Sequence, residues 1–234
     1  MMQQFKTEVI DVVQNTPSSR SVRFLRPNGF DYLPGQFVIL GLDCENGEVK
    51  KPLSLSSSPT EEFLAVTKRL TGHEFSNAFL SKKKGDAIRF TGPYGNFTLK
   101  EEHSKIAMLS GGIGITPLLS MIKYCTDMNM PTEILLFYSN RDESDIPFKD
   151  ELEALRERNS HLTVVNTLTR PGPLWMGHKG RINAKLIKEH IVDVNEWFFY
   201  SSGPEKMVDS MLLVLKEMNI PENRSLREYF PGYD

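Results

Sequence analysis

The chain is poor in the residues that mark several common classes of protein. It has two cysteines in 234 residues, Cys44 and Cys125, and they are too far apart to form a C-x-x-C motif. Two thiols cannot supply the four ligands of a cysteine-bound iron–sulfur cluster, and they give no disulfide framework. The sequence therefore predicts no iron–sulfur cluster in this chain, and its cysteine content is typical of a reducing cytoplasm.

Long apolar segments and large charged blocks are also missing. Residues 1–6 lack the apolar core of a signal peptide, and no apolar run approaches the roughly 20 residues that cross a membrane. The chain has 28 basic and 30 acidic residues, a net charge of −2, and its basic run is limited to the triplet 82–84. We therefore expect a soluble, cytoplasmic protein without a transmembrane segment that does not bind nucleic acid.

Metal-binding and hydrolase motifs are absent as well. The five histidines are dispersed, and the pair His73-Glu74 is not followed by a histidine at the metalloprotease spacing. The serine-rich segment 54–58 lacks the G-x-S-x-G elbow of a hydrolase. The sequence predicts neither a metal site nor a serine nucleophile.

The first hundred residues consist of short β-type runs between glycine and proline turn signals. Strands are predicted at residues 7–13, 21–25, 36–42, 52–56, 63–67 and 87–91. This rhythm predicts a small antiparallel barrel or sandwich.

After residue 101 the pattern changes to strands that alternate with amphipathic helices. Strands are predicted at residues 106–109, 133–138, 162–168, 197–200 and 226–230, and helices at 117–128, 148–158, 184–190 and 205–218. Such alternation is typical of a doubly wound parallel sheet with helices on both faces. We therefore predict two domains, residues 1–100 and residues 101–234.

The most informative segment is residues 111–117, Gly-Gly-Ile-Gly-Ile-Thr-Pro, which joins a predicted strand to a predicted helix. Glycines let the backbone approach an anion closely, while free N–H groups and the helix dipole face it. Pro117 stands where the third glycine of G-x-G-x-x-G would fall, so the pattern favours a dinucleotide-binding family other than the Rossmann dehydrogenases. A glycine turn also joins strand to helix in proteins that bind no nucleotide.

Four motifs in order resemble those of the ferredoxin–NADP reductase superfamily. They are KPLSLSS at 51–57, GPYGNF at 92–97, GGIGITP at 111–117 and SGP at 202–204. The resemblance covers nearly the whole chain, and it implies a flavin-binding, six-stranded antiparallel β-barrel followed by an NAD(P)-binding α/β domain. The implied function is an NAD(P)H-dependent flavin oxidoreductase that passes electrons to a protein or small-molecule acceptor. The alternative is a flavin-bearing electron-transfer or regulatory subunit of a larger complex, without turnover of its own.

The resemblance also implies the cofactors and partners. FAD is favoured over FMN because family members with the GPxGxF motif commonly hold the dinucleotide, and NAD(P)H is the expected substrate. The implied acceptor is a redox protein such as a ferredoxin, a flavodoxin or an oxygenase component.

The family's R-x-Y-S flavin motif corresponds here to Lys51, Pro52, Leu53 and Ser54. Lys51 would hold a flavin phosphate as a point charge, without the bidentate geometry of arginine. Leu53 would pack on the flavin ring without aromatic stacking, and Ser54 would hydrogen-bond the ring edge. An ordinary strand rich in serine and leucine is the alternative interpretation.

Further flavin contacts are implied by position. Val66 and Lys68 would lie along the ribityl chain, and Gly72 and Ser76 would hold a second phosphate at the start of a short helix. Ser76 as a simple helix N-cap is the alternative.

Near the C-terminus, Phe230 or Tyr233 would face the flavin ring, with Glu228 close by. A terminal strand held by apolar packing is the alternative for this segment.

The resemblance places the nicotinamide nucleotide against Gly111, Gly112, Gly114 and Thr116. Ser202, where most relatives have cysteine, would lie near the reacting carbon of the nicotinamide, at the carboxyl edge of the sheet. Further contacts are expected from residues that follow strand ends, which are Gly203, Pro204, Arg141 and Arg170. The two arginines would contact the adenosine ribose or a 2′-phosphate. The predicted catalytic residues are Ser54, Ser202 and Glu228.

Overall fold

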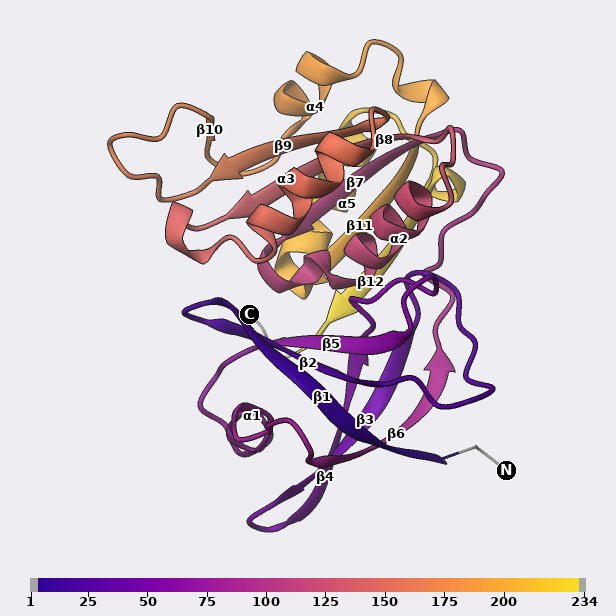
Figure 1. Cartoon of the computed structure of the whole chain (residues 1–234). Coiled ribbons are helices and arrows are strands. Elements are labelled where there is room, and N and C mark those ends of the chain that lie inside the picture. Colours follow the sequence, from indigo (N-terminus) through magenta and orange to yellow (C-terminus); the bar gives the residue numbers. More distant parts are fainter. Residues whose placement is uncertain (1–3, 232–234) are drawn as a thin grey trace.

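The computed structural model describes residues 4–231, which form an antiparallel sheet followed by a parallel sheet with helices. Figure 1 shows the two parts stacked on one another, with the α/β part above the strands of the first sheet. The first part contains β1 (Gln4–Thr16), β2 (Ser19–Leu25), β3 (Phe37–Cys44), β4 (Gly47–Ser54), β5 (Phe63–Arg69), α1 (Glu74–Leu80) and β6 (Ala87–Tyr94). The second contains β7 (Lys105–Gly111), α2 (Ile115–Asp127), β8 (Glu133–Asn140), α3 (Lys149–Arg158), β9 (Leu162–Leu168), β10 (His178–Lys179), α4 (Ala184–His190), β11 (Phe198–Pro204), α5 (Glu205–Glu217) and β12 (Ser225–Phe230). Single 3-10 turns lie at η1 (Gly112–Gly114), η2 (Glu143–Asp145), η3 (Val194–Glu196) and η4 (Glu222–Arg224).

The first sheet has six strands in the order β4-β3-β6-β1-β2-β5, and every neighbouring pair is antiparallel. An isolated bridge between Leu55 and Val66 joins the end of β4 to β5, so the sheet curls on itself. Its inner face is filled by large apolar side chains such as Phe24, Leu40 and Phe90. The predicted six-stranded antiparallel barrel is confirmed.

One strand of the barrel was predicted too late and too short. β4 runs from Gly47 to Ser54, whereas the sequence indicated residues 52–56. β4 pairs with β3 along its whole length, from the pair Cys44 and Gly47 to the pair Phe37 and Ser54. The charged first half of β4 faces solvent at the edge of the sheet. Because few of its side chains are buried, it has no alternating apolar pattern that the sequence could show.

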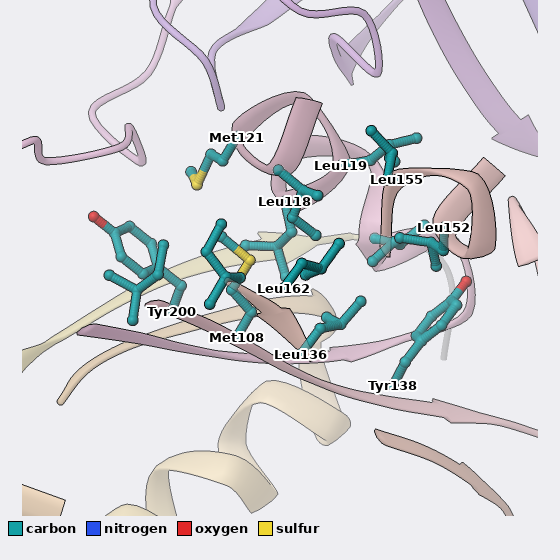
Figure 2. Packing of buried hydrophobic residues seen from close by; sticks show 14 of the residues in the cluster. Met108, Leu118, Leu119, Met121, Leu136, Tyr138, Leu152, Leu155, Leu162 and Tyr200 are labelled. Carbon is teal, nitrogen blue, oxygen red and sulfur yellow. The ribbon is translucent and has the colours of Figure 1, made fainter. Parts of the chain in front are cut away.

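The second sheet has six strands in the order β10-β9-β8-β7-β11-β12, all paired in parallel. Side chains of β7 alternate between its two faces: Ile106 and Met108 pack with α2 and α3, while Ala107 and Leu109 pack with α4 and α5. Figure 2 shows the first of these cores, where leucines of α2 and α3 meet residues of the sheet. The predicted doubly wound α/β sheet is confirmed.

Strand β11 is longer than the prediction of residues 197–200. It continues to Pro204 because β12 pairs with it as far as Phe230. Ser202 and Gly203 therefore lie inside the strand, whereas the sequence suggested that they follow it. Ser202 is flanked by Ser110 of β7 and Glu228 of β12.

The connection between the two sheets runs from β6 to β7 and contains the predicted boundary near residue 100. The hydroxyl of Tyr200 holds this connection to the second sheet: it accepts a hydrogen bond from Lys100 N and donates one to the carbonyl of Thr98. Within residues 4–231, no helix combines the length and the apolar character needed to span a bilayer.

Candidate functional site

Two cavities between the barrel and the α/β domain hold most of the predicted site residues. The central cavity, of about 640 Å³, is bounded by β4, β5 and α1 of the barrel and by the start of α2 and the end of β12. Nine predicted residues line it: Lys51, Pro52, Leu53, Ser54, Lys68, Ser76, Thr116, Glu228 and Phe230. They come from segments as distant in the sequence as Lys51 and Phe230, and the fold brings them together.

A hydrogen bond between Ser54 and Glu228 joins the two domains at this cavity. The Ser54 hydroxyl donates to Glu228 Oε2 at 2.9 Å. Burial raises the pKa of the Glu228 carboxyl to about 7, and the hydrogen bond from Ser54 offsets part of that rise. The carboxyl can therefore gain or lose a proton near neutral pH, which is the property required of a group that transfers protons.

Two lysines place positive charge in the central cavity. Lys51 is exposed on β4, and Lys68 is buried on β5. Burial, together with the nearby charge of Lys51, lowers the pKa of Lys68 to about 8. The charge of Lys51 is close enough to affect the ionisation of Lys68, and an anion such as phosphate bound beside them would relieve this repulsion.

The rest of the cavity wall is largely apolar. Leu53 is 7% exposed, and Phe37 and Phe230 contribute rings. Thr116 points its hydroxyl back to the carbonyl of Ile113 at 3.2 Å. Apolar walls with charged groups at one side fit a planar ring that carries a phosphate tail. Tyr233, the other predicted aromatic, lies outside the described residues.

The second predicted phosphate-binding segment contains Gly72 and Ser76, and Ser76 does not cap the helix there. His73 occupies the N-cap position of α1, so Ser76 is not the N-cap. The Ser76 hydroxyl accepts a hydrogen bond from Thr71 N at 2.9 Å, which leaves its own proton to donate. Gly72 has a φ of +76° and does not line the cavity, although its neighbours Thr71 and His73 do.

Val66 does not reach the central cavity. It is fully buried in the barrel core, where its backbone pairs with Leu55.

The second cavity, of about 190 Å³, surrounds the glycine turn and is called the glycine-turn cavity below. Four predicted residues line it: Gly111, Gly112, Arg141 and Pro204. Ile113 lines both cavities, so ligands that occupied them would meet at this residue.

The glycines of the turn, and Gly203 in the neighbouring strand, are required for different structural reasons. A Cβ on Gly114 would overlap the backbone of Ser202 and Gly203, so glycine allows η1 and β11 to pack closely. Gly112 has open space around it and a φ of +53°, a conformation that favours glycine. At Gly111 and Gly203 a Cβ would strike the side chain of Met207. Close packing thus explains Gly114, whereas Gly112 is left open toward the cavity.

Ser202 and Arg170 line neither cavity. The Ser202 hydroxyl is fully buried and has no hydrogen-bond partner among residues 4–231, which is costly for a polar group. Arg170 is exposed, and its backbone N–H donates to the carbonyl of Arg141 at 2.7 Å. The predicted roles of both residues stay predictions.

Sequence reasoning missed several residues that line these cavities. The barrel residues Ser18, Ser19 and Arg69 line the glycine-turn cavity, together with Asn140 and Asp145 of the α/β domain. No local motif marks the barrel residues, because they reach the site through the packing of one domain on the other. Asn140 ends β8 directly before the predicted residue Arg141, and this strand-end position is the signal that could have identified it.

A third cavity, of about 370 Å³, lies between the β1–β2 hairpin and the start of α3 and contains none of the predicted residues. Within residues 4–231, no group of histidine, cysteine or acidic side chains is arranged to hold a metal ion.

Comparison with known families matches the two halves of the chain to two domain models. Residues 7–99 match the oxidoreductase FAD-binding domain, and residues 108–212 match the oxidoreductase NAD-binding domain. The chain is 33% identical over 189 residues to ferredoxin–NADP reductase B of Sorangium cellulosum, covering 78% of this chain and 77% of the relative. It is 29% identical over 229 residues to the glycine betaine monooxygenase reductase subunit of Pseudomonas aeruginosa strain UCBPP-PA14, covering 94% of this chain. The chain spans 63% of the length of that relative.

Solved structures share the fold. A ferredoxin NADP+ reductase from Neisseria gonorrhoeae with bound FAD and NADP superposes with a TM-score of 0.84 at 21% identity, over 98% of this chain and 99% of that one. The cytochrome b5 reductase domain of Ulva prolifera nitrate reductase superposes with a TM-score of 0.83 at 21% identity, over 97% of each chain.

Proposed function

The chain belongs to the ferredoxin–NADP reductase superfamily, and on that premise we propose that it is a flavin-dependent NAD(P)H oxidoreductase that passes electrons to a separate acceptor. Its first half is an FAD-binding domain of this family and its second half an NAD-binding domain. The observation that carries the proposal is the shared wall at Ile113, where the central cavity and the glycine-turn cavity adjoin. Adjoining sites for a flavin and a nicotinamide are what direct transfer between the two rings requires.

The central cavity fits a flavin with a phosphate tail. Lys51 and Lys68 supply positive charge for phosphate, and Leu53 and Phe230 supply apolar surface for a ring. Lysine at position 51 gives up the bidentate contact of an arginine, so its contribution is mainly charge. We propose FAD as the resident cofactor and NAD(P)H as the electron donor. A bound flavin supplies the redox chemistry, because it accepts a hydride from nicotinamide and releases electrons singly or in pairs.

The chain's own residues orient the rings and handle a proton. Ser54 and Glu228 form a hydrogen-bonded pair at the cavity wall, and the Glu228 carboxyl holds or releases its proton near pH 7. Gly112 leaves the turn open to an approaching nucleotide. Ser202 lines neither cavity, and its buried, unsatisfied hydroxyl beside Glu228 in β11 would polarise or align the reacting end of the nicotinamide only if nucleotide binding brings the two together.

The proposed acceptor is a separate redox protein, such as a ferredoxin, a flavodoxin or an oxygenase component. Relatives named as reductase components of a monooxygenase and of a naphthalene 1,2-dioxygenase system support this assignment. The two cysteines of this chain cannot ligate a four-cysteine cluster, so the 234 residues of the chain supply no cluster between the flavin and the acceptor.

A visible spectrum of the purified protein, with the released flavin identified, tests the proposal. We expect FAD to be released, and its absorbance in the protein to bleach on anaerobic addition of NADH or NADPH. Steady NAD(P)H oxidation with an artificial acceptor would distinguish an independent enzyme from an electron-transfer subunit. Failure to bind either FAD or FMN at micromolar concentration would refute the proposal.

A further inference from the structure

The glycine-turn cavity has walls from both domains. The α/β domain contributes the glycine turn and the end of β8, and the barrel contributes Ser18 and Ser19 from the β1–β2 turn and Arg69 from the end of β5. The barrel thus reaches the cavity at which the family resemblance places only residues of the second domain.

The charges around this cavity are unbalanced toward positive. Arg69 is half-buried and Arg141 is exposed, and both line the cavity. Neither forms an ion pair within residues 4–231, where the arginines that do so are Arg23, Arg26, Arg89 and Arg158. Two guanidinium groups without carboxylate partners, facing a shared hollow, suit a ligand with two adjacent negative charges.

Asp145, the one carboxylate that lines this cavity, already accepts hydrogen bonds on both oxygens. Asp145 Oδ1 accepts hydrogen bonds from the hydroxyls of Thr16 at 2.5 Å and Ser18 at 2.6 Å, and its Oδ2 accepts from Ser18 at 2.8 Å. These bonds satisfy both carboxylate oxygens of Asp145. They also fasten the β1–β2 turn to the α/β domain, so Asp145 is a positioning residue for the barrel wall.

Backbone pairing fixes Arg69 beside this turn. Ser19 is paired with Arg69 in the β2–β5 ladder, and Leu70 N donates to the carbonyl of Ser18 at 2.7 Å. The position of Arg69 is therefore set by the same turn that Asp145 holds in place.

Asn140 provides a separate indication that a polar ligand belongs here. Its side chain is 5% exposed and lines the cavity. It acts on the neighbouring Tyr138 hydroxyl, but neither its amide oxygen nor its amide nitrogen makes a hydrogen bond of acceptable geometry within residues 4–231. An unpaired buried amide is costly, and a ligand group that bonds it would remove that cost.

We propose that Arg69 and the β1–β2 turn form the barrel's share of the nicotinamide-nucleotide site, with Arg69 contacting the diphosphate. This inference rests on the proposed function. The nucleotide then bridges the two domains: Gly112, Asn140 and Arg141 hold it from the α/β side, and Arg69 holds it from the barrel side. Binding of the nucleotide consequently stabilises the β1–β2 turn as well as the glycine turn.

The test compares Arg69→Gln with Arg156→Gln in the flavin-loaded protein. Arg156 is an exposed residue of α3 and lines neither cavity, so its variant makes the same change in charge at a remote place. Calorimetric titration with NAD+, NADP+ and ADP-ribose measures binding without turnover. Loss of a charged contact predicts that Arg69→Gln weakens all three roughly tenfold or more, while Arg156→Gln leaves them unchanged. The difference between wild type and Arg69→Gln should shrink at high salt, since screening weakens charge contacts.

Hydrogen exchange gives a second measurement that needs no variant. We expect NAD+ to slow exchange of the amides of Thr16, Ser18, Ser19 and Leu70 in the wild-type protein. If Arg69→Gln is unstable, Arg69→Lys, which retains the charge, should fold and bind within a few-fold of wild type. Equal affinities of wild type and Arg69→Gln, or no protection of the barrel turn, would overturn the inference and leave the proposed function standing. A wild-type protein that binds neither NAD+ nor NADP+ would instead overturn the proposed function.

Discussion

Replacement of Glu228 by glutamine tests the half-buried carboxyl at the domain junction. Burial raises the pKa of Glu228 from 4.5 to about 7. Between these values the folded protein binds the proton and the unfolded chain does not, so the free energy of unfolding must fall as pH rises through this window. Above about pH 7 Glu228 is ionised in both the folded and the unfolded state, and the loss of stability is complete.

The size of the effect follows from the same pKa values. A rise from 4.5 to about 7 corresponds to an upper limit of about 3 kcal/mol at 1.36 kcal/mol per pKa unit. Glu228 is only half-buried, so solvent screens part of this penalty and we expect about half of it. Glu228→Gln keeps the shape of the side chain and its contact with Ser54 but removes the titration. Relative to wild type, the variant should therefore gain stability as pH rises from 4.5 to 7.

Urea unfolding of both proteins from pH 4.5 to 8 measures this difference. Glu62→Gln is the matched control, because Glu62 is exposed and lines neither cavity. Its difference from wild type should stay flat over the same range. A Glu228→Gln curve that runs parallel to wild type from pH 4.5 to 8 would refute the assignment of a raised pKa to Glu228.

Three further predictions concern the flavin site, the packing of the glycine turn and the nucleotide site. Lys51→Ala should lose a charge-assisted phosphate contact of roughly 1.5–3 kcal/mol and release flavin more readily, whereas Lys51→Arg should retain it; flavin titration measures both, and unchanged affinity in the alanine variant would remove Lys51 from the site. Gly114→Ala should destabilise the fold by about 1–3 kcal/mol or more, because its methyl group would overlap the backbone of β11; a wild-type midpoint in chemical unfolding would contradict this packing. Ser202→Ala should slow flavin reduction more than it weakens nucleotide binding, as measured by stopped-flow limiting rate and saturation; a wild-type limiting rate would show that Ser202 is structural.

The hydrogen bonds across the domain interface explain how the two cavities keep their shape. Ser120 Oγ donates to the carbonyl of Ser57 at 2.5 Å, and Thr60 Oγ1 donates to Asp127 Oδ2 at 2.6 Å. Lys123, on α2, forms an ion pair with Glu61 of the barrel. Together with the bonds of Asp145, these contacts fix the barrel against the α/β domain, and the ligand sites lie between the two domains.

The sequence by itself determined that an antiparallel sheet is followed by a parallel α/β sheet, and it pointed to nine of the residues that line the central cavity. Period-two and period-3.6 patterns are local, so they predicted the antiparallel and parallel sheets, and α4 has the predicted bounds of 184–190. The motif at 51–54 and the glycine turn at 111–114 also lie within single segments. Patterns of this kind are visible in sequence because neighbouring residues share one element.

Tertiary structure alone decided which distant groups meet. Ser54 and Glu228 are 174 residues apart, and only their contact and burial set the pKa of the carboxyl. Pairing with β12 extended β11 through Ser202, and pairing with β3 formed the charged strand β4, which carries no apolar pattern. Arg69 has no motif of its own and reaches the glycine turn because one domain packs on the other. Such features depend on solvent exclusion and on long-range contacts, and local sequence encodes neither directly.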